Sequence, residues 1–253
     1  MNRVKSLSKC LVLKILFIGI IGVQTISCSS NGNDDDVTSS GLCAGFVDGT
    51  PRMHFEVEKK QFCDERDGKK YVYVQIGGQT WMAENLNFNA SSSRCYGDDT
   101  GGDSQDRCGT YGRLYNWATA MNETASSSAD PSGVQGVCPS GWHLPSKDEW
   151  DLLAVTVGGS ETAGIELKAN SSLWATNTGI DYFGFSALPG GFFGNQNDGF
   201  SNVGNVGGWW SATEDEGFDG AIALQREVSA GVNFLGLWQI RKEYLFSVRC
   251  VKG

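Results

Sequence analysis

Residues 70–82 read KYVYVQIGGQTWM. Residues 70–76 are rich in β-branched and aromatic side chains, which favour a strand. The pair Gly77-Gly78 tolerates the positive φ angles of a tight turn, and residues 79–82 return to an extended pattern. The stretch therefore predicts a β-hairpin, and with it antiparallel sheet.

Two helices are expected after this hairpin. Apolar side chains in residues 114–121 recur at i, i+3, i+4 and i+7, which places them on one helical face. Ser146 and Glu149 have the spacing of a capping box, in which each side chain bonds a backbone N–H of the other residue. The same apolar spacing continues to Val157, and Gly158 then ends the second helix.

The rest of the chain favours strands and long loops. Residues 89–110, 122–137 and 176–207 read as loops, and helical periodicity fades beyond residue 160. Residues 222–226 suit a short strand, and residues 244–250 alternate as a strand with one buried face. Few helices among several short strands predict an α+β fold.

The N-terminus has the order of an export signal. Basic side chains precede an apolar run at residues 15–23 that is too short to span a bilayer as a permanent helix. Ser27 then precedes Cys28, an arrangement that resembles the lipobox of bacterial lipoproteins, although Thr25 stands where that box usually has Leu. We expect residues 1–27 to be a signal peptide and Cys28 to carry the acyl chains, such as palmitate. The alternative is ordinary secretion with Cys28 unmodified.

Residues 28–41 form a polar, flexible tether that cannot bury a core. Its acidic run at residues 34–36 resembles the signal that sends some Bacteroidetes lipoproteins to the outer face of the outer membrane. This predicts an outer-membrane lipoprotein exposed at the surface, with a plain solvated linker as the alternative. Loss of residues 1–27 removes four of the 20 basic residues and none of the 29 acidic ones, leaving a net charge of −13. Such a charge argues against nucleic acid as a partner.

Six of the eight cysteines remain after Cys10 in the signal peptide and Cys28 at the lipid site are set aside. They are Cys43, Cys63, Cys95, Cys108, Cys138 and Cys250. An even number in an exported chain predicts three disulfides, and proximity favours pairing the first two and the middle two. Sequence alone does not choose among the roughly 15 pairings that six cysteines allow. No Cys-x-x-Cys pair supports a thiolate metal site instead.

Six blocks of sequence resemble the Fibrobacter succinogenes major paralogous domain, in the family's order, over about residues 67–253. They are YVQIGGQTWMAENLN at 73–87, YGRLYNW at 111–117, CPSGWHLPS at 138–146, DYFGFSALPGG at 181–191, WWSATE at 209–214 and FSVRCVK at 246–252. Residues 42–66 lie outside the resemblance and read as a small segment closed by its own disulfide.

The resemblance implies a C-type-lectin-like fold, related to the formylglycine-generating-enzyme fold. Two main helices would pack on short curled antiparallel sheets with long loops. The family pattern also pairs Cys138 with Cys250. Members occur in exported and lipid-anchored proteins, and the family does not bring an established activity with it.

Long loops on a cross-linked frame suit ligand binding. Tryptophans can stack on sugar faces, but five of the eight lie in core-like patterns: Trp81, Trp117, Trp142, Trp150 and Trp209. Trp174 and Trp238 lie in less patterned segments and are the candidate ligand-binding residues. The triplets that calcium-dependent lectins use, Glu-Pro-Asn, Gln-Pro-Asp and Trp-Asn-Asp, do not occur.

A metal site has its main candidate in one acidic loop, with residues 195–198 and 215–219 as weaker cases. Four aspartates crowd the loop between Cys95 and Cys108, and carboxylate oxygens suit calcium. They are Asp98, Asp99, Asp103 and Asp106. Their spacing does not fit an EF-hand, so we expect a solvated acidic loop and no cofactor, with bound calcium as the alternative.

Nothing in the sequence names a catalytic pair. His54 and His143 are the two histidines, and neither stands in a triad or zinc motif. We therefore expect a protein that is not an enzyme: a surface lipoprotein with a binding or adhesion domain for a polysaccharide or surface glycan. The alternative is a structural or assembly component of the envelope that binds protein partners. A third reading, an oxidase or hydrolase, would need a free thiol or a pair of carboxylates in a cleft.

Overall fold

The computed structural model describes residues 41–49, 52–54, 57–98, 104–176, 179–194 and 199–253. These residues belong to one compact unit. The expected signal peptide at 1–27, the lipid site Cys28 and all of the tether except Gly41 lie outside the described residues. Within the described part of the chain, no helix has the length and apolar character that a membrane span requires.

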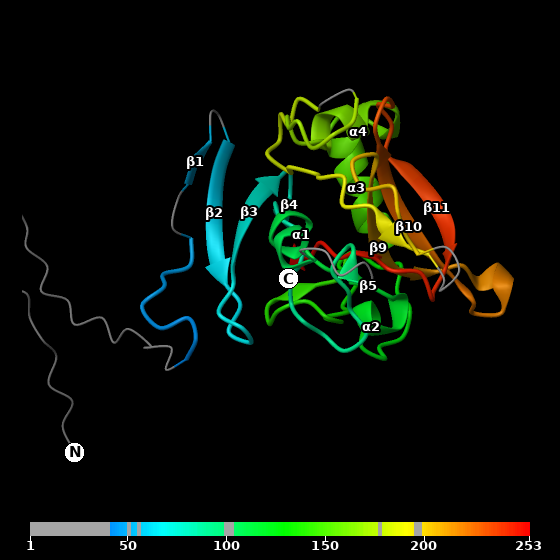
Figure 1. Cartoon of the computed structure of the whole chain (residues 1–253), viewed down its shortest axis with the longest axis horizontal. Helices are drawn as coiled ribbons and strands as arrows, with labels where there is room; N and C mark the ends of the chain where they lie inside the picture. The colour runs from blue at the N-terminus through cyan, green and yellow to red at the C-terminus, as the bar shows by residue number, and fades with distance from the viewer. Residues whose placement is uncertain (1–40, 50–51, 55–56, 99–103, 177–178, 195–198) are drawn as a thin grey trace, which may run out of the picture. The chain divides into compact units, whose positions relative to one another are not determined.

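The first sheet contains six strands in the order β1-β2-β3-β4-β13-β6 (Figure 1). They are β1 (Arg52–His54), β2 (Val57–Cys63), β3 (Lys70–Ile76), β4 (Gln79–Met82), β6 (Trp142–His143) and β13 (Val251–Lys252). Strands β3 and β4 form the hairpin that the sequence predicts, with Gly77 at φ +58° in the turn. A side chain at Gly77 would also meet the Cγ2 of Thr156, so the turn packs closely on a helix.

The second sheet runs in the order β11-β10-β9-β12-β5. Its strands are β5 (Leu114–Tyr115), β9 (Val206–Glu214), β10 (Ile222–Ser229), β11 (Gly236–Arg241) and β12 (Phe246–Ser247). Strands β7 (Phe192–Phe193) and β8 (Phe200–Ser201) form a separate pair. Neighbours pair antiparallel except β12 and β9, which are parallel.

Four α-helices are described, with a short 3-10 helix, η2 (Glu216–Phe218). They are α1 (Ser104–Tyr111), α2 (Trp117–Met121), α3 (Lys147–Thr156) and α4 (Ser160–Leu167). The capping box at the start of α3 is confirmed, since Ser146 Oγ accepts from Glu149 N and Glu149 Oε2 accepts from Ser146 N. The mixture of few helices and antiparallel sheets confirms the α+β class.

The helix expected over residues 114–121 is only half correct. Leu114 and Tyr115 form β5, because they pair with the C-terminal strand β12. The helix begins at Trp117, where the Asn116 side chain accepts from Thr119 N. Helices α1 and α4 were not expected from the sequence. Helix α4 begins after Gly159, which offers no side-chain cap, so its start carries no local signal.

The segment expected to be one strand over 244–250 passes between the two large sheets. Strand β12 belongs to the second sheet and β13 to the first. Ser247 and Arg249, expected on a solvated face, are therefore buried along with their neighbours. The chain ends directly after β13, which lies between β4 and β6 in the first sheet.

Three disulfides hold this arrangement together. They join Cys43 to Cys63, Cys95 to Cys108 and Cys138 to Cys250, with Cα–Cα distances of 5.9, 5.1 and 6.0 Å. The expected pairing is confirmed. The five tryptophans assigned to the core are also buried.

Candidate functional site

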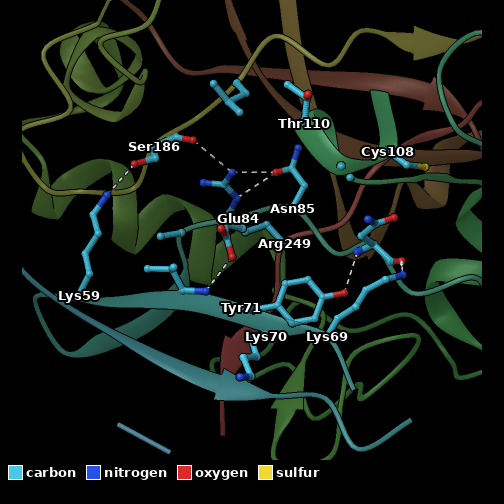
Figure 2. A pocket seen from close by; sticks show the side chains of 16 residues that line it. Lys59, Lys69, Lys70, Tyr71, Glu84, Asn85, Cys108, Thr110, Ser186 and Arg249 are labelled. Carbon is cyan, nitrogen blue, oxygen red and sulfur yellow. Dashed lines mark hydrogen bonds between the residues drawn. The ribbon is translucent and has the colours of Figure 1, made fainter. Parts of the chain in front are cut away.

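A cavity of about 800 Å³ opens beside β3 and the segment that follows β4 (Figure 2). Strand β2 contributes Lys59 and the C-terminal crossing contributes Arg249. The end of α1 and residues 186–188 complete the wall. The cavity thus depends on segments that are far apart in the sequence.

Arg249 is buried in the wall, with 1% of its surface exposed. Its Nε and Nη2 donate to Asn85 Oδ1 at 3.1 and 2.8 Å, and Nη1 donates to the Phe185 carbonyl. The guanidinium also lies 4.2 Å from the centre of the Phe185 ring. Among the described residues, its hydrogen-bond acceptors are all neutral oxygens. Burial lowers the pKa of Arg249 to about 9, against the opposing effects of Asp181 and Glu84.

Lys59 is the second buried cation of the wall. Its Nζ donates to Ser186 Oγ at 2.7 Å and lies 3.9 Å from Asp181 Oδ2. Burial lowers the pKa of Lys59, and Asp181 acts in the opposite direction. Nearby Arg249 lowers the same pKa, which indicates that the two cations repel each other across the wall.

Lys69 and Lys70 line the same cavity. Lys69 Nζ donates to the carbonyl of Asn87, and it lies 3.2 Å from Asp67 Oδ2. The Lys70 ammonium lies 5.0 Å from the centre of the Phe46 ring. Glu84 is the acidic residue among those that line the cavity, and its Oε2 accepts from Val72 N at 2.7 Å. The lining therefore carries four cations against one carboxylate.

Tyr71 supplies a hydroxyl near the same wall. Its Oη accepts from Asn87 N at 3.0 Å, and burial raises the pKa of the phenol. The hydroxyl therefore stays neutral and can act only as a hydrogen-bonding group.

The expectation that Trp174 lies at the surface is wrong. Only 3% of Trp174 is exposed, and its Nε1 donates to the Ala187 carbonyl at 3.2 Å. It packs in the core with Trp81 and Trp150 because the loop that carries it folds onto α4 and β10. Trp174 is therefore part of the interior and cannot bind a ligand at the surface.

Trp238 lies at the surface, with 47% of its area exposed. It stands on β11, the edge strand of the second sheet. A Cβ atom at Gly236 would lie 2.6 Å from Trp238 Nε1 and 3.3 Å from Cε2 of Phe234. Phe234 is itself 39% exposed. The two rings therefore gather over the bare backbone of Gly236, and we call Phe234, Gly236 and Trp238 the aromatic surface.

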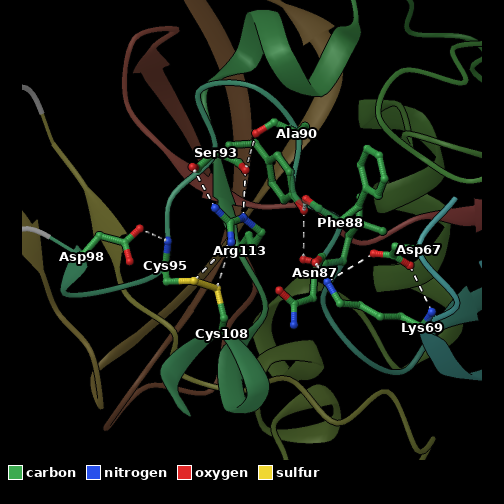
Figure 3. Close-up of a disulfide and its surroundings, with 12 residues drawn as sticks. Asp67, Lys69, Asn87, Phe88, Ala90, Ser93, Cys95, Asp98, Cys108 and Arg113 are labelled. Carbon is green, nitrogen blue, oxygen red and sulfur yellow. Dashed lines mark hydrogen bonds and ion pairs between the residues drawn. A yellow bond between two sulfur atoms is a disulfide. The ribbon is translucent and has the colours of Figure 1, made fainter. Parts of the chain in front are cut away.

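The acidic loop is only partly described (Figure 3). Asp98 Oδ2 accepts from Cys95 N at 2.6 Å. Asp99 and Asp103 lie outside the described residues, as does the side chain of Asp106 on α1. In the part of the chain that the structure describes, no group of three metal-ligating side chains occurs. The calcium hypothesis stays a prediction.

Arg113 fixes the disulfide of this loop (Figure 3). Its Nη1 lies 3.4 Å from Cys95 Sγ and 3.7 Å from Cys108 Sγ. Nε and Nη2 donate to the side chain and carbonyl of Ser93. The loop is therefore held at its base, next to the cavity wall that includes Cys108.

His143 has a partner that the sequence did not reveal. Its Nε2 lies 2.6 Å from Glu149 Oε1, and both residues are buried. The other Glu149 oxygen accepts from the backbone N–H groups of Ser146 and Ser132. These contacts use Glu149 as a structural anchor for α3. The side chain of His54 lies outside the described residues.

A comparison with known protein families shows the family of this chain. A model of the Fibrobacter succinogenes major domain matches residues 74–252. The chain belongs to the Fibrobacter succinogenes major domain family. The match leaves Lys59, Lys69 and Lys70 outside it, although all three line the cavity of the family domain. No curated protein and no solved structure matches the chain.

Proposed function

We propose that this member of the Fibrobacter succinogenes major domain family is a non-catalytic, glycan-binding lipoprotein of the outer membrane, displayed at the cell surface. Cys28 carries the lipid, and residues 28–41 hold the domain away from the membrane. We also propose that the fold is of the C-type-lectin-like kind, because a few short helices occur with short antiparallel sheets and three disulfides fix the loops.

The observation that carries the glycan proposal is the aromatic surface. A sugar ring presents an apolar face of C–H groups, and an exposed tryptophan offers a large rigid area for it. Gly236 allows the Trp238 indole to approach the backbone of an edge strand, with Phe234 beside it. Exposure of about half of such a side chain costs hydrophobic free energy that stacking on a ligand would recover.

The test is an array of plant, host and bacterial glycans probed with the purified full chain. Binding should be lost with Trp238→Ala. It should also weaken with Gly236→Ala, which keeps the indole but pushes it away from the strand. Phe218→Ala is the matched control, since Phe218 is 53% exposed on η2 and outside the aromatic surface. Silence of the wild-type chain across the array, or equal loss with the control, would refute the glycan proposal.

The anchor has its own test. Metabolic labelling with palmitate should mark the wild-type chain and should not mark Cys28→Ala. Protease added to intact cells should then remove the domain from the wild-type chain. Labelling of the variant would show that Cys28 is not the lipid site, and protection from protease would place the domain inside the envelope.

One observation favours the alternative, a protein partner in the envelope. Among the strands that the structure describes, β11 stands at the edge of its sheet, so one row of its backbone groups has no strand beside it, and Leu237 on it is 40% exposed. Such an edge can pair with a strand of another protein. Leu237→Lys should block that pairing and leave the face of Trp238 unchanged. Loss of a cross-linked partner with Leu237→Lys, but not of glycan binding, would support this alternative.

A further inference from the structure

We propose that the cavity beside β3 binds a small ligand that carries a carboxylate, and that lysines preceding the family match at residues 74–252 give it this selectivity. The inference goes beyond the glycan-binding surface, because Phe234, Gly236 and Trp238 do not line the cavity. It rests on the charge, burial and origin of the cavity wall.

The first step is the contrast of charge. The full chain carries a net charge of −9, so a cluster of cations is unusual for it. The wall nevertheless combines Lys59, Lys69, Lys70 and Arg249 with Glu84. A concave surface lined by one sign of charge concentrates ions of the other sign. This wall therefore favours an anion although the chain as a whole is acidic.

The second step is that Arg249 and Lys59 meet at one residue. Ser186 accepts from Lys59 at Oγ, and its carbonyl lies 3.5 Å from Arg249 Nη2 (Figure 2). Two buried cations that share a neutral residue repel each other, and burial alone makes each charged form costly. An anion placed between them would reduce both costs.

The third step is the counter-ion that is already present. Asp181 accepts from Ser186 N and Oγ at 2.7 and 2.6 Å, and it lies 3.9 Å from Lys59 Nζ. It therefore offsets part of the charge of Lys59. Among the described residues, no carboxylate lies within salt-bridge distance of Arg249. Asp67 offsets part of the charge of Lys69 in the same way, at 3.2 Å from its Nζ, so the wall keeps a small excess of positive charge.

The ligand class follows from geometry. A carboxylate has two oxygens that can accept from two separate donors at once, and charge-assisted bonds of this kind are strong. The volume of about 800 Å³ is in the range of ordinary ligand pockets and accommodates one or two sugar rings. An acidic sugar is the probe that best fits both the charge and the size.

The fourth step is where the cations come from. The family match begins at Val74, and Lys59, Lys69 and Lys70 precede it. Strand β2, which carries Lys59, pairs with β3 and is fastened by the disulfide between Cys43 and Cys63. Within the matched residues, Arg249 is the cation that lines the cavity. The residues that precede the match therefore supply three of the four cations of the site.

The experiment measures binding to the purified full chain by isothermal titration calorimetry. Galacturonate and glucuronate are the ligands, and galactose and glucose are neutral controls of the same shape. Inorganic sulfate and phosphate show whether another anion is preferred. We expect both uronates to bind at least tenfold more tightly than the neutral sugars.

Three variants locate the site. Lys59→Gln should weaken uronate binding about tenfold or more, as expected for the loss of one charge-assisted bond. Lys70→Gln should weaken it a few-fold, because Lys70 is exposed and its charge is screened by solvent. Lys60→Gln is the matched control. It removes the same charge from β2, at a residue that does not line the cavity. It should change affinity by less than about twofold.

Each outcome decides the inference. If Lys59→Gln fails to fold by circular dichroism, Lys70→Gln against Lys60→Gln remains the test. Equal affinity for uronates and neutral sugars, or preference for sulfate or phosphate with no response to uronates, would overturn the proposal. So would equal effects of the Lys60 and Lys70 variants. Trp238→Ala should leave uronate binding intact, so failure of the glycan-binding surface and failure of this site can be told apart.

Discussion

Asn85 Oδ1 accepts two hydrogen bonds from Arg249, across 164 positions of sequence, and a third from Trp209 Nε1 at 2.8 Å. The amide nitrogen of Asn85 donates to the Tyr111 carbonyl and to Ser247 Oγ. One neutral side chain thus positions the buried guanidinium of the cavity wall. Because the acceptor is neutral, these hydrogen bonds do not neutralise the positive charge of Arg249.

Asn85→Asp should reduce uronate affinity at least tenfold, because it places a permanent carboxylate against Arg249 and supplies the anion that the ligand would bring. Asn85→Leu should instead destabilise the fold by about 2–4 kcal/mol, since it leaves buried donors without an acceptor. Calorimetry of ligand binding and urea unfolding of both variants check the two effects. Unchanged uronate affinity in a folded Asn85→Asp chain would contradict a role for Arg249.

Glu149→Ala should lower the free energy of unfolding by about 3–5 kcal/mol, because it breaks a buried pair with His143 and removes the acceptor for two backbone N–H groups. Ser146→Ala removes only the cap and should cost about 1 kcal/mol. Urea unfolding with the disulfides intact measures both. Glu161→Ala is the control, because Glu161 is exposed in the first turn of α4 and should change stability by less than about 0.5 kcal/mol.

The disulfides should differ in their contribution according to the loop that each closes. Cys138 and Cys250 are separated by 112 positions, and Cys95 and Cys108 by 13. The chain-entropy model gives about 5 and about 3 kcal/mol respectively. Replacing each pair by serine and comparing urea midpoints tests the order. A larger loss from the shorter loop would show that local strain or contacts outweigh chain entropy.

Anion binding should be coupled to proton uptake at alkaline pH. Burial and Arg249 lower the pKa of Lys59, while Asp181 and Glu84 raise it, and a bound carboxylate would raise it further. Binding should therefore take up protons at alkaline pH below the ordinary lysine pKa of about 10.4, and affinity should fall as pH rises through that range. Calorimetry in buffers of different ionisation enthalpy measures the uptake. Lys59→Gln should reduce it and leave the share of Arg249, whose pKa burial lowers to about 9, while an uptake equal to that of the wild-type chain would exclude Lys59 as a proton acceptor.

Local signals in the sequence were sufficient to predict structure where residues close together in the chain form each other's hydrogen bonds. The hairpin of β3 and β4 has the bounds expected from residues 70–82. The capping box of α3 is formed by two residues three positions apart. Composition likewise fixed the acidic character of the chain and the even number of cysteines left for cross-linking. The hairpin and the capping box depend on interactions that span a few residues. The net charge and the cysteine count depend on composition alone.

Tertiary structure decided the features that depend on contacts between residues far apart in the sequence. Leu114 and Tyr115 became a strand because β12 lies beside them, and Trp174 entered the core because its loop packs on α4. The cavity could not be read from the chain, since Lys59, Ser186 and Arg249 share no motif and meet only when both sheets close on the C-terminal segment. Sequence determines which groups must be bonded or buried, but the partner of a buried charge is chosen by packing across the whole domain, where local periodicity carries no information.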